Sequence, residues 1–167
     1  ASARRLYPEM PDVHYNAGVS LHKTGRLDEA EAKYRYALEL DPEMAAARDN
    51  LGILLATQGR YDEAIEQARR AVELEPWNVA TRGNLAAAYC GCGRLGEGIR
   101  EYRAAVGIDP GNRRALSGLA RAYFAKGALH EAAAACDRAE ALGCRFDPSM
   151  VKELSRYRDR SGGGETP

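Results

Sequence analysis

Apolar residues along the chain recur at steps of three and four, the spacing of one face of an α-helix. Leu51, Leu54 and Leu55 illustrate it, with Gln58 one turn further on. Short turn segments separate such stretches, so the pattern predicts an all-α protein built from helix pairs. The first helices of the pairs are expected near 11–24, 45–58, 79–92 and 113–126, and the second helices near 28–40, 62–74, 96–108 and 130–142.

The whole pattern returns every 34 residues. Prolines and glycines mark the period most clearly: Pro8, Pro42, Pro76 and Pro110, and Gly25, Gly59, Gly93 and Gly127. An apolar column keeps the same register: Leu6, Leu40, Leu74, Ile108 and Leu142. Several columns at one period indicate a tandem-repeat architecture. Each glycine follows one helical stretch and precedes another, so we expect it to end a helix in the left-handed conformation.

Acidic residues near the turns are candidates for helix caps. The prolines at 42, 76 and 110 follow an acidic residue, and Asp–Pro is typical of a helix start with the acid as N-cap. These residues are Asp41, Glu75 and Asp109. Asp28 and Asp62 are expected to cap the second helices, with Glu31 completing a capping box behind Asp28.

Small residues recur where the two helices of a pair must approach each other. They are Gly18, Gly52, Ala86 and Ala120 on the first helices, and Ala30, Ala64, Gly98 and Ala132 on the second helices. A glycine inside a helix costs about 0.5–1 kcal/mol relative to alanine. Gly18 and Gly52 therefore indicate a tight crossing, because a larger side chain there would force the helices apart.

Together these columns resemble the tetratricopeptide repeat, a 34-residue helix–turn–helix unit. The matching marks are the segments NAG, NLG and NLA, the turn glycines, the closing prolines and the column Leu21, Leu55, Tyr89 and Tyr123. The resemblance implies an α-solenoid, a right-handed superhelix of stacked antiparallel helix pairs. Four units are expected, at 11–44, 45–78, 79–112 and 113–147. The tryptophan frequent early in the family's first helix is replaced here by His14, Arg48, Arg82 and Leu116.

The two ends of the stack need their own description, because a terminal repeat leaves one face uncovered. Residues 148–160 are expected to form a C-terminal capping helix, with Asp147 as N-cap and the apolar face Met150, Val151, Leu154 and Tyr157. Residues 161–167 are expected to be a disordered tail. Residues 1–10 are in register with the end of a second helix, which predicts the tail of a truncated preceding repeat; an extended lead-in is the alternative.

The family resemblance implies that the first helices line a concave groove that binds a peptide or protein segment. The residues expected to point into it are Tyr15, Asn16, Val19, His22, Lys23, Asp49, Asn50, Ile53, Thr57, Asn84, Ala87, Cys90, Arg114, Ser117, Arg121 and Phe124. Asn16, Asn50 and Asn84 form a column 34 residues apart that is broken by Gly118. A side-chain amide both donates and accepts, so this column could hydrogen-bond an extended peptide backbone. The alternative is that these amides bond locally.

Charge is balanced, with 24 basic and 24 acidic residues, and lacks the basic excess usual in nucleic-acid-binding proteins. Along the expected groove, Asp12 and Asp49 lie toward the N-terminal half, and Arg114 and Arg121 toward the C-terminal half. A ligand with an acidic segment over the fourth unit would fit this asymmetry, and solvated charges with no specific partner are the favoured alternative. No run of eighteen apolar residues is present, so no membrane insertion is expected.

No catalytic, cofactor or metal site is predicted. The cysteines lack zinc-ligand spacing and are expected to be free thiols in a reducing, cytoplasmic compartment; they are Cys90, Cys92, Cys136 and Cys144. The histidines are scattered, no acid or thiol recurs at a repeat-matched position near them, and the sequence contains no phosphate-binding loop motif. The Arg-heavy composition favours a bacterial source. Trp77 falls in a turn between units, where it either packs beneath the next repeat or forms an exposed contact.

Three functions follow as hypotheses. The first is a scaffold that binds a partner protein or peptide in the concave groove. The second is a structural protein that self-assembles through its N-terminal edge, and the third is a repeat arm of a larger enzyme or secretion component. The family's clamp for chaperone C-termini is not expected, because Asn50 alone of its five positions matches.

Overall fold

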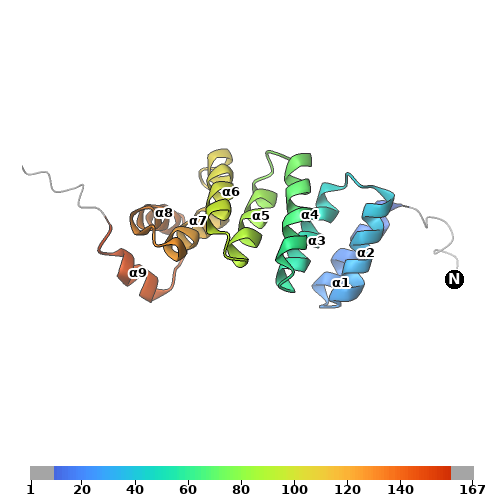
Figure 1. Cartoon of the computed structure of the whole chain (residues 1–167), viewed down its shortest axis with the longest axis horizontal. Helices are drawn as coiled ribbons and strands as arrows, with labels where there is room; N and C mark the ends of the chain where they lie inside the picture. The colour runs from blue at the N-terminus through green and yellow to red at the C-terminus, as the bar shows by residue number, and fades with distance from the viewer. Residues whose placement is uncertain (1–9, 159–167) are drawn as a thin grey trace, which may run out of the picture.

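The computed structural model describes residues 10–158, which form nine α-helices and no strand. The helices follow one another in a single row, with α1 and α9 at opposite ends (Figure 1). Their bounds are α1 Pro11–Lys23, α2 Leu27–Leu40, α3 Ala45–Thr57, α4 Tyr61–Leu74, α5 Val79–Gly91, α6 Leu95–Ile108, α7 Arg113–Lys126, α8 Leu129–Ala141 and α9 Pro148–Leu154. The eight helices expected for the four pairs are confirmed within one or two residues at each end. The expectations for residues 1–9 and 161–167 lie outside the described part of the chain.

Consecutive helices pack as antiparallel pairs, α1 with α2, α3 with α4, α5 with α6 and α7 with α8. Each second helix also packs on the first helix of the next pair, and the first helices contact one another in the order α1, α3, α5, α7. The result is the right-handed α-solenoid that the family resemblance implies. None of the helices within residues 10–158 is long and apolar enough to cross a membrane.

Glycines end the first helices as expected. Gly25, Gly59, Gly93 and Gly127 have φ values of 77°, 77°, 82° and 78°. A Cβ atom added at any of the four would meet nothing within 4 Å. Backbone conformation, and not space, therefore requires glycine at these turns, since other residues rarely adopt positive φ.

The Asp–Pro prediction for the helix starts is wrong. Asp41, Glu75 and Asp109 are the C-cap residues of α2, α4 and α6, and the next helices begin three residues after each proline. The Asp41 carboxylate accepts the Glu43 N–H at 3.0 Å, which closes a turn and not a helix. In the later turns asparagine provides the cap: Asn78 accepts from the Ala80 N–H and Asn112 from the Ala115 N–H, both at 3.0 Å.

The predicted caps of the second helices are also wrong. The N-cap residues of α2 and α4 are Arg26 and Arg60, and neither makes a side-chain cap bond. Asp28 and Asp62 are the second residues of their helices, where their negative charges interact favourably with the positive end of the helix dipole. Glu31 pairs with two arginines instead of closing a capping box. Arg35 and Arg60 each bring a guanidinium nitrogen to 2.8 Å from its carboxylate.

The close helix crossings are confirmed. Ala30, Ala64, Ala86, Ala120 and Ala132 are all fully buried. A Cβ atom at Gly98 would lie 2.9 Å from the carbonyl oxygen of Ala86 on α5, so these two helices are in contact through their backbones. Larger residues fill the space between pairs, among them Leu51, Leu54, Leu55 and Leu116.

The C-terminal capping helix is present but shorter than expected, since α9 ends at Leu154. Asp147 is its N-cap and accepts the Ser149 N–H at 2.8 Å, as predicted. Met150 and Leu154 are buried against the end of the stack. Residues 159 and 160 of the predicted helix lie outside the described region.

Trp77 does not pack beneath the next repeat. It lies in the turn between α4 and α5, and its exposed fraction is 81%. The alternative of an exposed side chain therefore holds.

Candidate functional site

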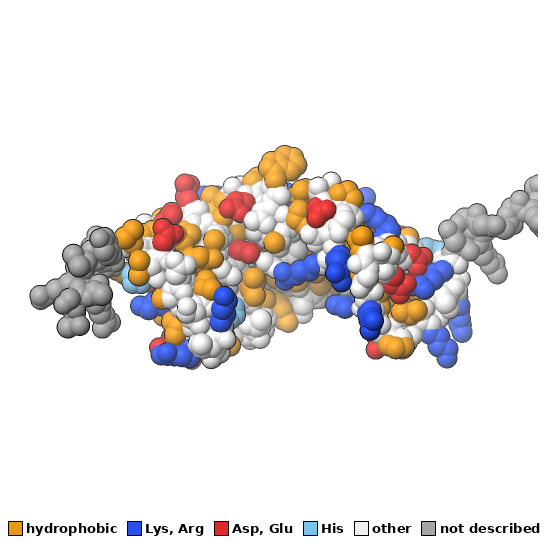
Figure 2. Space-filling model, turned by 180° about the vertical axis from the view of Figure 1, so that it is seen from behind, with side chains coloured by type: hydrophobic (Ala, Val, Ile, Leu, Met, Phe, Trp, Pro, Cys, Tyr) orange, Lys and Arg blue, Asp and Glu red, His pale blue; other side chains and the backbone are white. Residues whose placement is uncertain are grey.

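The candidate site is the face formed by the first helices α1, α3, α5 and α7, on which the expected groove residues lie. Seen from behind the view of Figure 1, the molecule is hollowed beneath its middle, and Lys and Arg side chains gather there (Figure 2). Equivalent positions of successive first helices come together on this face because each repeat places its helix pair in the same way.

Side-chain hydrogen bonds join three consecutive first helices at the centre of this face. The Asn84 amide on α5 donates to both carboxylate oxygens of Asp49 on α3, at 3.0 and 2.9 Å. Arg114 on α7 donates from Nη2 to the Asn84 side-chain oxygen at 2.8 Å. Asn84 is 9% exposed, so its polar groups are satisfied mainly by these two neighbours.

A similar bond joins the first two repeats. The Asn50 amide donates to the Tyr15 hydroxyl at 2.9 Å. Local bonding, the alternative for the asparagine column, thus applies to Asn50 and Asn84, whereas Asn16 is exposed. A peptide-binding role for the column stays a prediction.

Asp49 is the acidic residue at the centre of the network. Burial raises the pKa of its carboxyl group, and the Asn84 hydrogen bond and the Arg114 charge act in the opposite direction. The net direction is upward because removing the charge from water outweighs the two favourable contacts. The ionised Asp49 carboxylate therefore lowers the stability of the fold, and the hydrogen bonds from the Asn84 amide offset part of this cost.

A hollow of about 230 Å³ opens beside this network between α3, α4, α5 and α7. Its walls are small and mainly apolar, and Asn84 and Arg114 supply the polar edge. The lining residues are Gly52, Ile53, Ala56, Thr57, Ala64, Ala68, Asn84, Ala87, Ala88 and Arg114.

A second hollow of about 300 Å³ adjoins the first toward the C-terminus. It is lined by Ala87, Cys90, Leu95, Tyr102, Gly118, Arg121, Ala122 and Ala125. Ala87 lines both hollows, so they form one groove across α3, α5 and α7. Larger hollows of about 500 and 460 Å³ lie elsewhere, one along α4 and one between α6 and α8. Most of their lining residues lie outside the first helices.

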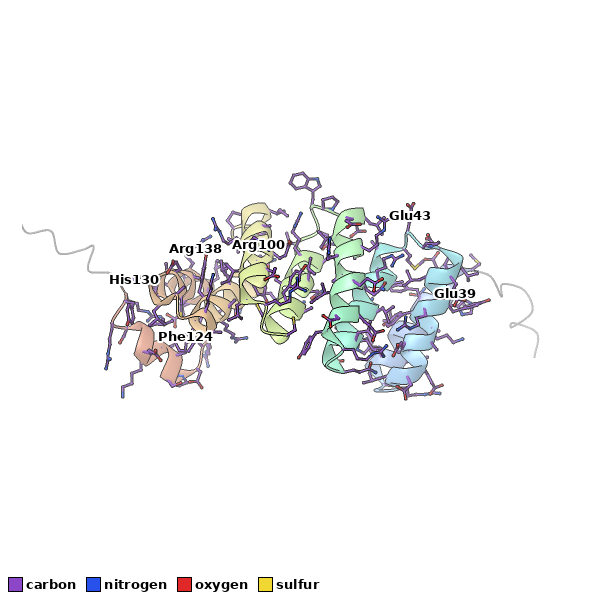
Figure 3. All side chains as sticks on the ribbon, in the orientation of Figure 1. Glu39, Glu43, Arg100, Phe124, His130 and Arg138 are labelled. Atoms are coloured by element: carbon purple, nitrogen blue, oxygen red, sulfur yellow. The ribbon has the colours of Figure 1, made fainter. Side chains whose placement is uncertain are left out.

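Seven of the predicted residues line the groove: Ile53, Thr57, Asn84, Ala87, Cys90, Arg114 and Arg121. The predicted residues of α1 line neither hollow. Of these, His22 is associated with Tyr34, whose hydroxyl is 3.5 Å from its Nδ1 atom. Phe124 is on α7, toward the C-terminal end of the row (Figure 3), and packs against the core there.

Sequence reasoning missed the contribution of the second helices. Ala64 and Ala68 on α4 form the back of the first hollow, and Tyr102 on α6 forms a wall of the second. Tyr102 also explains why the asparagine column ends at Gly118: a side chain at position 118 would collide with the tyrosine ring. The signal was present in the sequence, because Tyr34, Ala68 and Tyr102 are spaced by 34 residues.

The groove shows no nucleophile of raised reactivity. Burial raises the pKa of the Cys90 thiol, which keeps it protonated near neutral pH. Burial likewise raises the pKa of Tyr102 to about 12. Within residues 10–158, no group of three or more His, Cys, Asp or Glu side chains is arranged to hold a metal ion.

Comparison with family models decides the classification. Two models of the tetratricopeptide repeat match the sequence, one at residues 1–45 and 23–78 and the other at residues 93–142. The chain belongs to the tetratricopeptide repeat family. Its helix pairs, turn glycines and stacked first helices are those of a protein-interaction scaffold of this kind. No curated protein matches the sequence.

Solved structures of MamA share the fold. A crystal structure of MamA superposes with a TM-score of 0.77 at 21% identity, covering 93% of this chain and 86% of MamA. MamA from Desulfovibrio magneticus RS-1 gives a TM-score of 0.74 at 22% identity, covering 93% and 81%. A further MamA structure, from AMB-1, gives 0.73 at 26% identity, covering 80% and 79%. These similarities establish the solenoid architecture.

Proposed function

We propose that this tetratricopeptide repeat protein binds an extended segment of a partner protein along its first-helix face. The observation that supports the proposal is the groove of two adjoining hollows across α3, α5 and α7, which share Ala87. A groove that runs across successive repeats suits a ligand that extends across them in the same direction. Its mainly small apolar walls, with a few polar groups at the edge, are those of a recognition site.

The charges of the groove indicate the character of the segment. Arg114 and Arg121 are exposed on α7, and within residues 10–158 neither forms an ion pair with a carboxylate. A guanidinium group without a carboxylate partner is a ready site for an acidic group. An acidic residue of the segment is therefore expected over α7, which accords with the charge asymmetry of the sequence.

Substitution of Ala87 tests the groove. Ala87 is exposed and lines both hollows, so Ala87→Trp should block the groove without disturbing the core. Ala134→Trp is the matched control, because Ala134 is an exposed helical alanine that lines the outer hollow between α6 and α8. Each purified variant is used to capture partners from an extract of the source cell, and the captured proteins are compared.

Loss of a specific partner with Ala87→Trp and its retention with Ala134→Trp would support the groove. Retention by Ala87→Trp and loss with Ala134→Trp would place binding on the outer face and overturn the proposal. Circular dichroism of each variant confirms that both stay helical, since the same residue exchange in both helices carries the same propensity cost.

A second candidate function is self-association through the N-terminal edge. Val13 on α1 is 49% exposed, whereas its counterparts 34 and 102 residues on, Ala47 and Ala115, are 0% and 2% exposed. Met10 and Tyr36 add exposed apolar surface at the same end. Light scattering across a concentration series tests this, with Val13→Glu expected to abolish any dimer. A wild-type chain that remains monomeric at high concentration would rule it out.

A further inference from the structure

One position in the repeat is occupied by a large ring in two units and by a methyl group in the unit between them. Tyr34, Ala68 and Tyr102 are equivalent residues of α2, α4 and α6. Tyr34 is 1% exposed, and its ring lies against Gly18, where an added Cβ would be 2.8 Å from the ring carbons. Tyr102 is 8% exposed and lies against Gly118.

At Ala68 the ring is missing and the space remains. Gly52 is the counterpart of Gly18, and a Cβ added at Gly52 would be 3.2 Å from the Ala64 carbonyl oxygen. The helices α3 and α4 are thus as close as in the other pairs. The hollow of about 230 Å³ arises because a side chain is absent, and not because the helices separate.

The hollow has a size and lining that suit an aromatic ring. An apolar cavity of about 150 Å³ is large enough to hold benzene. Five alanines and a glycine line this hollow, and no charged group except Arg114 at its edge does so. Tyr34 shows that this position of the fold accepts a six-membered ring, because it packs on Gly18, the counterpart of Gly52, in a repeat followed by Asn50, the counterpart of Asn84. The Tyr102 ring instead lies over Gly118, where Asn84 is the counterpart in this repeat.

Arg114 provides a second, polar anchor at the mouth. Its Nη2 atom is held by the Asn84 side-chain oxygen at 2.8 Å, and Asn84 is held in turn by Asp49. A guanidinium group has five N–H donors, so most of them are left for a ligand. Arg121 lies two helical turns further along α7 and lines the adjoining hollow.

We propose that the hollow at Ala68 is a side-chain pocket that takes an aromatic residue of the partner segment, and that a carboxylate next to this residue pairs with Arg114. The inference rests on the proposed function and names the ligand of the same groove. The aromatic ring present at this position in the neighbouring repeats is absent here, and the aromatic side chain of the partner takes its place. The carboxylate can belong to an Asp or Glu side chain or to a chain terminus, since the guanidinium fork fits both.

Small peptides test the pocket directly. The probe is N-acetyl-Phe-Glu-amide, which is titrated into the whole chain while its backbone-amide NMR signals are followed. Its chemical-shift changes should centre on Gly52, Ala64 and Ala88. N-acetyl-Ala-Glu-amide should bind at least about tenfold more weakly, because burying a Phe ring supplies most of the affinity. N-acetyl-Phe-Gln-amide should bind about threefold more weakly, because an exposed ion pair contributes modestly. N-acetyl-Phe-Gly with a free carboxylate distinguishes the two sources of the acid.

Ala68→Tyr is the decisive variant, because it restores the ring of the neighbouring repeats. Tyr34 already coexists with Asn50, the counterpart of Asn84, so the new ring should be accommodated. We expect Ala68→Tyr to reduce binding of N-acetyl-Phe-Glu-amide at least about tenfold while its Tm is unchanged or raised. Ala134→Tyr, on the outer face, is the matched control and should bind as the wild type does. If Ala68→Tyr fails to fold, Ala68→Leu fills part of the space and should lower the affinity in the same direction.

Arg114→Gln provides an independent readout. It should bring the affinities for N-acetyl-Phe-Glu-amide and N-acetyl-Phe-Gln-amide within a factor of about 1.5 of each other, since the charge that distinguishes them is gone. Equal binding of the Phe and Ala peptides, unchanged binding by Ala68→Tyr, or shifts centred on α6 and α8 would each overturn the pocket. A partner lost with Ala87→Trp but kept by Ala68→Tyr would leave the groove function standing and remove the pocket alone. A partner kept by both variants would remove both.

Discussion

The amide of Asn84 holds both carboxylate oxygens of Asp49, at 3.0 and 2.9 Å, across the boundary between two repeats. Asn84→Ala would leave a half-buried carboxylate without its donor, which costs about 1–3 kcal/mol of unfolding free energy. Urea unfolding followed by circular dichroism measures the loss. Asn16→Ala is the control, because Asn16 is the exposed member of the same column and should change stability by less than about 0.5 kcal/mol. Equal effects of the two substitutions would contradict a structural role for Asn84.

Asp49→Asn should be more stable than the wild type at neutral pH. Because burial raises the pKa of the Asp49 carboxyl group in the folded chain, the folded state holds this proton more firmly than the unfolded state does. The wild type therefore loses stability as the pH rises through the folded pKa, and the variant does not. The Tm difference should be smallest below the ordinary Asp pKa of about 3.9 and grow toward pH 7. A constant difference across that range would show that Asp49 does not titrate in this way.

Two glycines should respond in opposite directions to alanine. In Gly98→Ala the new methyl group would meet the Ala86 carbonyl at 2.9 Å, and a backbone atom cannot move aside, so stability should fall by about 1–3 kcal/mol. Gly83 is inside α5 with nothing within 4 Å of an added Cβ, so Gly83→Ala should gain about 0.5–1 kcal/mol. Thermal unfolding of the two variants gives the comparison. A gain from Gly98→Ala would mean that α5 and α6 are not in backbone contact.

Trp77→Ala should leave the unfolding free energy within about 0.5 kcal/mol of the wild type, because an 81% exposed ring makes few contacts. Trp77 is the one tryptophan of the sequence, so tryptophan emission, excited selectively over the tyrosines, reports on this turn alone. The emission of the native protein should already resemble that of the urea-unfolded chain. A strong shift to longer wavelength on unfolding would indicate that the ring is packed in solution.

The repeat period explains why the sequence predicts the fold so closely. A column such as Gly25 and Gly59 repeats one local requirement, positive φ, and the structure meets it at each position. The caps were missed because Asp–Pro is equally compatible with a helix start and with a turn after a helix. Whether a helix start or a turn forms there depends on how far the preceding helix continues to pack against its neighbours. The spacing of residues in the sequence does not give that information.

The site could be predicted only in part, for a related reason. The first helices supply Ile53 and Arg114 to the groove as expected, because their face follows from helical periodicity. The partners of Asn50 and Asn84 depend on the rotation between adjacent pairs, which periodicity does not give. The hollow at Ala68 was not predicted, because it results from a missing side chain and alanine is common in helices. Only comparison with the equivalent residues Tyr34 and Tyr102 distinguishes this alanine from others.

The aromatic rings of Tyr34 and Tyr102 and the methyl group of Ala68 occupy equivalent positions, so adjacent repeats differ in the space that they leave open there. Neighbouring helix pairs have the same backbone arrangement but different side chains at this position. Exchanging one side chain can therefore open or fill a pocket without moving a helix. In such a chain, the ligand specificity of each repeat can change independently, by substitution of one residue.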